Sequence, residues 1–250
     1  MSESHRYSTR TAIAVVVANM VGTGVFTSIG FQILDIQSSF VLLMLWLVGG
    51  LLALCGALTY AELASRLPRS GGEYHFLSQL YHPAVGFISG WVSLTVGFAA
   101  PTALAAMTFA AYLDSAVGHL LPVNRQLAAL LLVLVITLVH GRDHKASGGL
   151  QNWFTLIKIL LIALFVTAVT LGTDTPQPVH LLPGAGDGPL LLSSAFAVSL
   201  IYVNYAYTGW NAATYITGEI DHPARSVPVV LIGGTAIVIV LYLALNATFL

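Results

Sequence analysis

Long apolar runs, separated by short polar stretches, dominate the sequence. A helix needs about 20 mostly apolar residues to cross the hydrocarbon of a membrane. Seven runs are candidate spans, at residues 11–34, 40–63, 85–113, 123–140, 153–172, 190–217 and 227–250. The third run is long enough to tilt, and Pro101 predicts a kink in it because proline cannot continue the helical hydrogen bonds. The pattern therefore predicts an all-α protein that crosses a membrane several times.

Composition agrees with this pattern. The chain has 250 residues, of which 57% are hydrophobic and 8% are charged, and its mean hydropathy is +0.86. A soluble domain carries about 25% charged residues, so we expect an integral membrane protein in contact with lipid. The net charge of −1 gives no sign of nucleic-acid binding. Cys55 is the only cysteine, which excludes a disulfide framework, and the N-terminal stretch lacks the layout of a cleavable signal peptide.

Basic residues predict the orientation, because Lys and Arg accumulate on the cytoplasmic side of membrane proteins. If every candidate run crosses, Arg125 is alone on one side. The other side has seven basic residues, which are Arg6, Arg10, Arg66, Arg69, Arg142, Lys145 and Arg225. We therefore expect a cytoplasmic N-terminus and a place in the plasma or inner membrane. The segment 62–83 is too polar to span, and its second half is predicted as a short amphipathic helix at the cytoplasmic face.

Two of the candidate spans carry residues that interrupt a helix. The first contains Gly22-Thr23-Gly24, and the sixth contains Thr208-Gly209. With five spans between their starts, these two segments would run in opposite directions. Interrupted helices at matching places in two opposed halves are typical of inverted-repeat transporters, whose substrate binds at the interruptions. The alternative is that the glycines are small-residue contacts between packed helices.

An interrupted helix offers partial charges without ionised side chains. At the midplane it leaves N–H groups on one half-helix and carbonyl groups on the other, and such backbone persists only where it is buried or lines a watery cavity. The N-terminus of a half-helix attracts a carboxylate, and the carbonyls attract an ammonium. A pair of interruptions therefore suits a zwitterion such as an α-amino acid.

Four motifs, in order along the chain, resemble those of the amino acid–polyamine–organocation (APC) transporters. They are GTGVF at 22–26, a cytoplasmic segment with Glu62-Leu63, Pro68, Gly71-Gly72, Tyr74, Gly86 and Gly90-Trp91, YAYTGWN at 205–211, and GEIDHPARSVP at 218–228. The resemblance covers nearly the whole chain. It implies the leucine-transporter-like five-plus-five inverted-repeat fold with unwound spans 1 and 6. Residues 1–172 would form the first repeat, and residues 173–250 would begin the second with spans 6 and 7.

The same resemblance implies a function and roles for individual residues. The chain would transport L-amino acids without sodium, by exchange or proton coupling. The substrate carboxylate would meet the backbone N–H groups and the hydroxyl around Thr23, Gly24 and Val25, and Gly22 belongs to the same substrate-binding set. The substrate ammonium would meet carbonyls of both interruptions, at Met20, Tyr205, Ala206 and Thr208. Trp210 would be a pocket wall or gate, or else an aromatic facing lipid or core, and Asn211 would bind substrate or hold the unwound strand.

Lys158 is a charged residue within the fifth span. It lies six residues after Asn152, which is about 9 Å along a helix. Many sodium-independent members of the resembling family have a lysine here, where sodium-coupled members hold an ion between spans 1 and 8. The resemblance therefore implies that its ammonium bridges to span 1 carbonyls near Gly22, as a static contact or as a proton carrier. The alternative is a lysine that snorkels to the membrane surface.

Acidic residues bear on the choice of substrate. None of the ten lies at mid-membrane in this arrangement, which favours neutral amino acids, because a cationic side chain usually pairs with a carboxylate. A cationic amino acid or polyamine antiporter of the same fold is the alternative. A non-transporting membrane sensor or partner-binding protein is another. No acid pair, zinc motif or activated nucleophile indicates an enzyme, and no metal or other cofactor is predicted, because the eight histidines lack metal-ligand spacing.

The number of spans raises a question about partners. A second repeat of five would need spans 6 to 10, and only spans 6 and 7 are predicted here. A shortened protein, a fragment of a gene, or a piece completed by another chain would each explain this. In the last case a second copy of the chain, or a different protein, would supply the missing spans.

Overall fold

The computed structural model describes residues 6–117, 124–142, 144–173 and 179–250. These residues form helices and one isolated backbone bridge between Tyr7 and Ile220, and no strand occurs among them. The all-α prediction is confirmed for this part of the chain. The chain divides into two compact units, of which unit 1 contains Met1–Gly72 and Asn152–Leu250 and unit 2 contains Glu73–Gln151.

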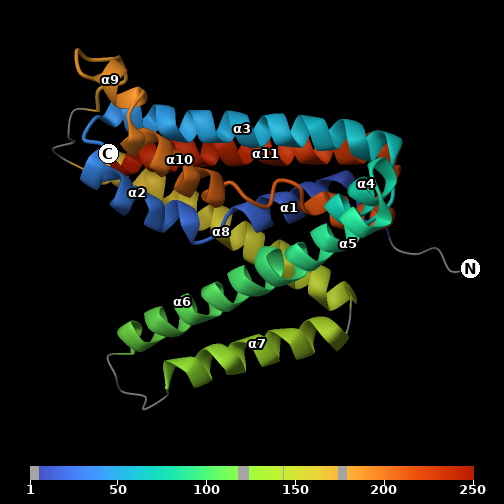
Figure 1. The fold of residues 1–250 in the computed structure, drawn as a ribbon. Helices are drawn as coiled ribbons and strands as arrows, with labels where there is room; N and C mark the ends of the chain where they lie inside the picture. The colour runs from blue at the N-terminus through green and yellow to red at the C-terminus, as the bar shows by residue number, and fades with distance from the viewer. Residues whose placement is uncertain (1–5, 118–123, 143, 174–178) are drawn as a thin grey trace, which may run out of the picture. The chain divides into compact units, whose positions relative to one another are not determined.

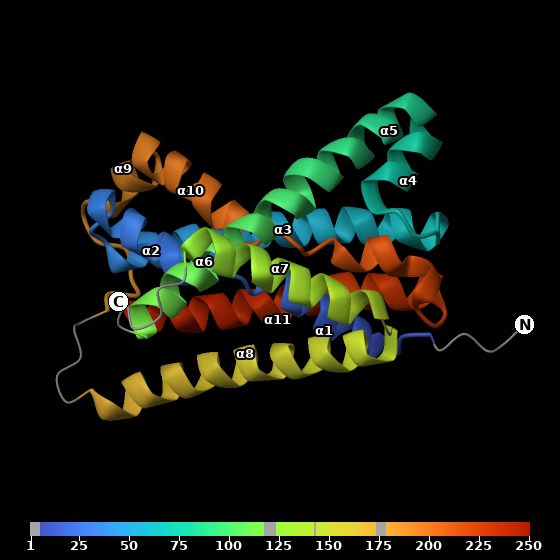
Figure 2. The same ribbon diagram turned by 90° about the horizontal axis from the view of Figure 1, so that it is seen from below.

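Unit 1 is built on two long apolar helices, α3 (Ser39–Arg66) and α11 (Pro223–Phe249), which lie side by side (Figure 1, Figure 2). Its other helices are α1 (Thr9–Met20), α2 (Gly24–Asp35), α8 (His144–Gly172, which begins in unit 2), α9 (Asp187–Leu191), α10 (Ser194–Ala206) and the 3₁₀ helix η2 (Ala212–Glu219). Gly50 of α3 permits close packing, because a Cβ there would lie 2.8 Å from Cγ1 of Ile239 in α11. Small residues of this kind let membrane helices approach one another.

Unit 2 contains α4 (Gly72–Leu80), α5 (Pro83–Val92), the π helix η1 (Ser93–Ala99), α6 (Ala100–Ala116) and α7 (Arg125–Arg142). Helix α4 is the short helix predicted in the second half of the polar segment 62–83, and its place at the cytoplasmic face stays a prediction. Helices α6 and α7 lie side by side (Figure 1), around a small core of Ala106, Ala110 and Ala129. An ion pair of 2.6 Å between Arg125 and Asp114 joins the two helices near the loop between them.

A wider helical turn precedes Pro101, where the sequence predicts a kink. The π helix η1 ends at Ala99, and Pro101 stands at the start of α6. A proline within a helix removes one N–H donor, and its ring clashes with the carbonyl four residues earlier, which here is Gly97. A π turn relieves this clash, because its carbonyls bond to amides one residue further along. The continuous run Pro83–Ala116 is nevertheless long and apolar enough to cross a membrane.

The number of predicted spans is only partly supported. Among the described residues, four helices are long and apolar enough to cross a membrane, namely Ser39–Arg66, Pro83–Ala116, Gln151–Gly172 and Pro223–Phe249. The pair α1 and α2, bent by 46°, makes a fifth if it counts as one broken span. The predicted fourth and sixth spans coincide with shorter apolar helices, Arg125–Val139 and Ser194–Ala206, and they stay predictions. By length and composition, the described part of the chain therefore has four or five segments able to cross a membrane.

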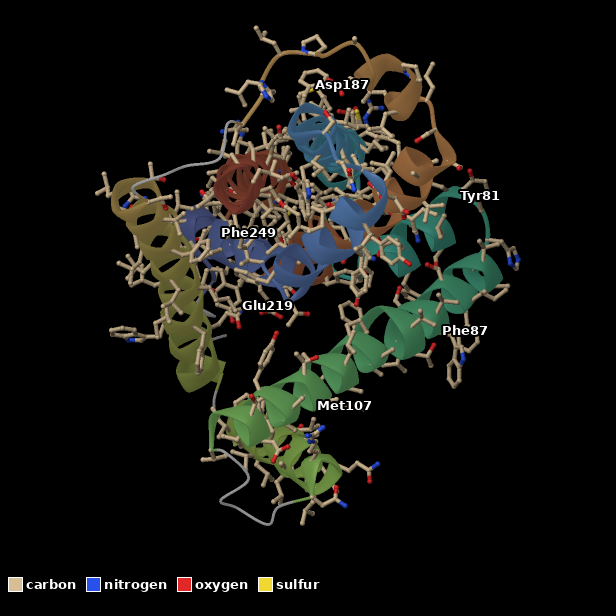
Figure 3. All side chains as sticks on the ribbon, turned by 90° about the vertical axis from the view of Figure 1, so that its left-hand side faces the viewer. Tyr81, Phe87, Met107, Asp187, Glu219 and Phe249 are labelled. Carbon is tan, nitrogen blue, oxygen red and sulfur yellow. The ribbon has the colours of Figure 1, made fainter. Side chains whose placement is uncertain are left out.

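Unit 2 exposes many large apolar side chains. Tyr81, Phe87 and Met107, labelled in Figure 3, are 75%, 63% and 60% exposed in the isolated chain. A soluble protein rarely exposes continuous apolar surface on this scale. Such a surface is expected to contact lipid, so these exposed apolar side chains agree with a multi-pass membrane protein.

Backbone contacts join three distant segments at the η2 end of unit 1. The Tyr7 amide donates to the Glu219 carbonyl at 2.6 Å, and the Asp221 amide donates to the Tyr7 carbonyl at 3.1 Å. In addition, the Gly218 amide donates a hydrogen bond of 2.8 Å to the hydroxyl of Ser70. The end of η2 and the residues directly after it are therefore held both by Tyr7 and by the turn after α3.

The loop before α10 is tied to the N-terminal end of α3 by Asp187 (Figure 3). The Asp187 carboxylate accepts a hydrogen bond of 2.6 Å from the Gly184 amide. This bond, the Ser38 hydroxyl and the nearby charge of His180 lower the pKa of Asp187 below its ordinary value. The His180 amide also donates to Ser39 at 3.1 Å. Both ties use the residues that begin α3.

The lowered pKa predicts how this loop responds to pH. A carboxyl whose pKa is lower in the folded state stabilises that state above its unfolded pKa, and the stabilisation is lost as the pH falls through the folded pKa. We therefore expect the loop 179–193 to resist proteolysis at neutral pH and to become cleavable on acidification below the ordinary range of carboxyl groups. Asp187→Asn should make it cleavable at neutral pH. Asp35→Asn, which changes an exposed acid three residues before Ser38, is the control, and equal cleavage of the two variants would contradict the prediction.

Candidate functional site

The first helix interruption lies where the sequence predicts it. Helix α1 ends at Met20 and α2 begins at Gly24, with the non-helical residues 21–23 between them. The two helices meet at an angle of 46°. The Asn19 side chain donates to the Val15 carbonyl at 2.9 Å and so supports the last turn of α1. The interruption of the helix is thus at the predicted residues, whereas its place in a membrane span stays a prediction.

The second interruption is also at its predicted position. Helix α10 ends at Ala206, a turn covers residues 207–211, and the chain continues as the 3₁₀ helix η2. Gly209 has a φ of +104°, a conformation that other residues rarely adopt. The Thr208 hydroxyl donates to the Tyr205 carbonyl at 2.7 Å, which satisfies one of the last carbonyls of α10.

The two interruptions lie against each other. A Cβ at Gly24, the first residue of α2, would be 3.1 Å from the Cα of Ala206 at the end of α10. In return, a Cβ at Gly209 would be 2.8 Å from the carbonyl carbon of Asn19 near the end of α1. Each break therefore places a glycine on the backbone of the other. Gly24 and Gly209 are therefore small-residue contacts between helices and also lie at the helix interruptions, so the two interpretations of these glycines do not exclude each other.

A tyrosine of α11 connects the carboxyl ends of both broken helices. The Tyr242 hydroxyl is 2.6 Å from the Met20 carbonyl and 3.1 Å from the Ala206 carbonyl. A hydroxyl has one proton, so it donates to one of these carbonyls at a time, and the shorter distance favours Met20. Each carbonyl has a second lone pair that is able to accept another donor.

Lys158 of α8 contacts the first interruption. Its Nζ lies 3.2 Å from the Val21 carbonyl and 3.4 Å from the Ala18 carbonyl. This is the backbone contact expected from the sequence, whereas the part of Lys158 in transport stays a prediction. The ammonium places a positive charge at the negative end of the α1 dipole, where a cation is stabilised.

The polarity of the helix ends suits a ligand with two charges. The N-terminus of α2 carries the positive end of its dipole, and Thr23 at its N-cap position makes no side-chain capping bond to the helix. The carboxyl ends of α1 and α10 carry the negative ends of theirs. Because Gly24 and Ala206 are in contact, the two polarities lie within the length of a small molecule. A carboxylate is favoured at the first and an ammonium at the second.

The residues predicted to bind substrate differ in exposure. Gly22, Thr23, Tyr205 and Thr208 are exposed, whereas Gly24, Trp210 and Asn211 are partly buried. Three are buried, namely Met20, Val25 and Ala206. Residues of the buried group offer only their backbone to a ligand, which is the role predicted for them. All ten belong to unit 1, and their contacts with a substrate stay predictions.

Trp210 packs on helix α3. Its indole fills the space above Gly56, since a Cβ there would be 2.7 Å from Cζ2 of the ring. Tyr60, one turn further along α3, meets the indole edge-on with ring centres 4.9 Å apart. Trp210 is therefore held by α3 directly after the second break. Asn211 reaches Tyr215 at 3.5 Å through its side-chain amide.

Sequence reasoning missed Tyr242, Gly56 and the aromatic residues around Tyr242. One signal was available for Tyr242, because a tyrosine in the middle of an apolar run needs a partner for its hydroxyl once it is buried. Gly56 gives no such signal, since its role depends on which side chain lies above it. Among the described residues, no three His, Cys, Asp or Glu side chains lie close enough together to hold a metal ion.

Known proteins similar to this chain are amino acid transporters. The family model described as amino acid permease matches residues 7–250. The b(0,+)-type amino acid transporter 1 of Mus musculus is 30% identical over 242 residues, which are 95% of this chain and 49% of that protein. The serine/threonine exchanger SteT of Bacillus subtilis (strain 168) is 26% identical over 96% of this chain and 53% of its own.

A further relative is the large neutral amino acids transporter small subunit 2 of Homo sapiens. It is 26% identical over 246 residues, which are 95% of this chain and 45% of that protein. This chain therefore spans about half the length of the relatives that it matches.

Proposed function

This chain belongs to the amino acid permease family, and from that premise we propose that it transports L-amino acids across a membrane by alternating access around its two helix breaks. The observation that carries this proposal is the mutual contact of the breaks at Gly24 and Gly209. This contact supports the proposal because it brings the N-terminus of α2, which favours a carboxylate, next to the carboxyl end of α10, which favours an ammonium.

We propose that transport is independent of sodium and proceeds by exchange or with protons. The support is the position of Lys158, whose ammonium lies at two carbonyls of the first break. Backbone carbonyls of this kind are also able to bind a sodium ion. Because the Lys158 ammonium already lies at these carbonyls, no sodium ion is needed there. The name of one relative, a serine/threonine exchanger, agrees with exchange.

The preferred substrates are neutral amino acids. No Asp or Glu occurs at residues 9–34 or 188–218, which include both breaks. A cationic side chain in the pocket would therefore lack a carboxylate from these segments. The names of two relatives mention serine and threonine and large neutral amino acids, which agrees with this preference.

The arrangement in the membrane is part of the proposal. We propose that the protein lies in the plasma or inner membrane with its N-terminus on the cytoplasmic side. Residues 1–172 would form the first repeat, and residues 173–250 would begin the second. We propose that the transporter contains a second chain, either a second copy or a different protein. One relative is named as a small subunit, so assembly from more than one chain has a parallel among similar proteins.

Amino-acid counterflow into proteoliposomes tests the proposed function. Uptake of labelled neutral L-amino acids by vesicles loaded with unlabelled amino acid, equal with and without sodium, is the expected result. Cationic amino acids compared in the same assay test the alternative antiporter. Binding of an amino acid without any flux would favour a sensor, or a transporter that needs its second chain. Absence of both binding and flux in folded protein would contradict the proposal.

Trp210 and Gly56 allow a prediction about substrate size. Trp210→Ala should improve affinity for large neutral amino acids relative to small ones, because the indole no longer fills its space. Gly56→Ala should shift the ratio the other way, since the added methyl group pushes the indole off α3. One methylene in a pocket changes selectivity by roughly 10-fold or more. Competition assays with alanine and phenylalanine measure the ratio, and a shift of both variants in the same direction would contradict the prediction.

A further inference from the structure

Trp46 of α3 is the centre of a fully buried aromatic cluster. It is 0% exposed, as is Tyr242, and Tyr207 is 1% exposed. The ring of Trp46 lies 6.0 Å from that of Tyr207 and 5.6 Å from that of Tyr242, which it meets edge-on at 89°. The two tyrosine rings are 5.0 Å apart. These are favourable separations for aromatic pairs, so the three rings form one packed group.

The indole of Trp46 holds helix α2. Its Nε1 donates to Oε1 of Gln32 at 3.0 Å, and Gln32 is 1% exposed. An indole N–H is only a donor, so the orientation of the Gln32 amide follows from its partner. Gln32 lies two turns after the N-terminus of α2. The bond therefore fixes the half-helix that begins at Gly24.

The same cluster holds the other two helix ends. The Tyr207 hydroxyl donates to the backbone carbonyl of Trp46 at 3.1 Å, and Tyr207 is the residue directly after α10. The Tyr242 hydroxyl reaches the last carbonyls of α1 and α10, at Met20 and Ala206. The helices α1, α2 and α10 are thus all connected to Trp46. Gln32 makes the connection for α2, Tyr242 for α1, and Tyr207 together with Tyr242 for α10.

Stability alone does not explain the bond between Gln32 and Trp46. The other half of the Gln32 amide, Nε2, is buried and has no hydrogen-bond partner in the described part of the chain. A buried donor without a partner carries its full cost of desolvation. Replacing both partners by apolar residues of similar shape removes this cost and is often neutral. What an apolar pair would not supply is a directed link between α2 and α3.

From these contacts we infer that Trp46 is a positioning residue that sets the placement of the two breaks relative to each other. It acts on α2 through Gln32 and on the ends of α1 and α10 through Tyr207 and Tyr242. Loss of the link lets the breaks open more often without unfolding the unit. The consequence for substrate rests on the proposed function, whereas the positioning itself is a property of the ligand-free chain.

Hydrogen-exchange mass spectrometry on the full chain in lipid nanodiscs tests this inference. The double variant Trp46→Phe with Gln32→Met keeps a large apolar side chain at both positions and removes the link. We expect exchange to rise about tenfold in peptides covering residues 19–25 and also in those covering 205–211. The midpoint of thermal unfolding should match that of the wild type. Trp153→Phe, the same change at a side chain that is 66% exposed, is the matched control.

Two further results decide between the inference and a structural role. Tyr207→Phe removes the bond to the Trp46 carbonyl and should raise exchange at 205–211 alone. If the double variant exchanges like Trp153→Phe at either break, or if its exchange rises evenly over α3 and α11, the inference is overturned. Amino-acid binding is measured separately. A wild-type chain that binds no amino acid contradicts the proposed function and leaves the exchange result to decide the positioning role.

Discussion

Replacing Gly209 with alanine is expected to remove most amino-acid binding. The backbone at Gly209 has a φ of +104°, and a residue with a side chain held in such a conformation costs about 1–3 kcal/mol. In addition, the new Cβ would lie 2.8 Å from the Asn19 carbonyl carbon and 2.9 Å from its oxygen. Since these are backbone atoms, the two breaks have to separate. A combined cost of about 3 kcal/mol corresponds to a loss of affinity of roughly a hundredfold.

Two other glycines provide a graded comparison. Gly24→Ala should weaken binding less than Gly209→Ala does, because its Cβ would be 3.1 Å from Ala206 and its backbone is helical. Gly30→Ala, later in α2, has no atom within 4 Å of the new Cβ and should bind as the wild type does. Calorimetry or equilibrium binding gives the affinities, and the midpoint of thermal unfolding checks folding. Equal affinities of the Gly209 and Gly30 variants would refute the idea that the contact between the breaks forms the site.

The breaks themselves are readable from the sequence, but their contact is not. A glycine pair or a Thr-Gly step within an apolar run disfavours continuous helix, and this alone predicts where α1 and α10 end. That Gly24 faces Ala206 while Gly209 faces Asn19 depends on how residues almost 200 positions apart come together. The sequence suggests this pairing only through the matched positions of the two breaks.

Hydropathy predicts where an apolar segment begins and ends more reliably than it predicts which helix or turn the backbone forms within that segment. The sixth apolar run, residues 190–217, is a helix of 13 residues followed by a turn and a 3₁₀ helix. In the third run, Pro101 identifies the place of the irregularity, whereas the choice of a π turn depends on how the carbonyls before it find partners. Tyr242 and Trp46 stand in apolar runs like many aromatic residues, so the sequence indicates that their polar groups need partners once they are buried but does not identify those partners.

Removing the ammonium of Lys158 is expected to abolish transport while sodium stays without effect. The Nζ lies 3.2 Å and 3.4 Å from two carbonyls at the end of α1. Hydrogen bonds that involve a charged group contribute about 1.5–3 kcal/mol each. Lys158→Met keeps most of the apolar stem and loses both bonds, so the position of Val21 beside Gly22 is no longer fixed. The expected fall in counterflow rate is on the order of a hundredfold.

A set of variants on α8 separates the contact from the charge. Lys158→Arg keeps a cation with several donors but a longer, planar group, and it should retain part of the flux if the ammonium is a static contact. If Lys158 carries protons, the arginine variant should fail, because a guanidinium stays protonated. Leu161→Met, one turn away and 59% exposed, is the control for a change of side chain on the same helix. Counterflow by Lys158→Met at the rate of Leu161→Met would mean that the lysine only snorkels, and the two carbonyl contacts would then have no part in transport.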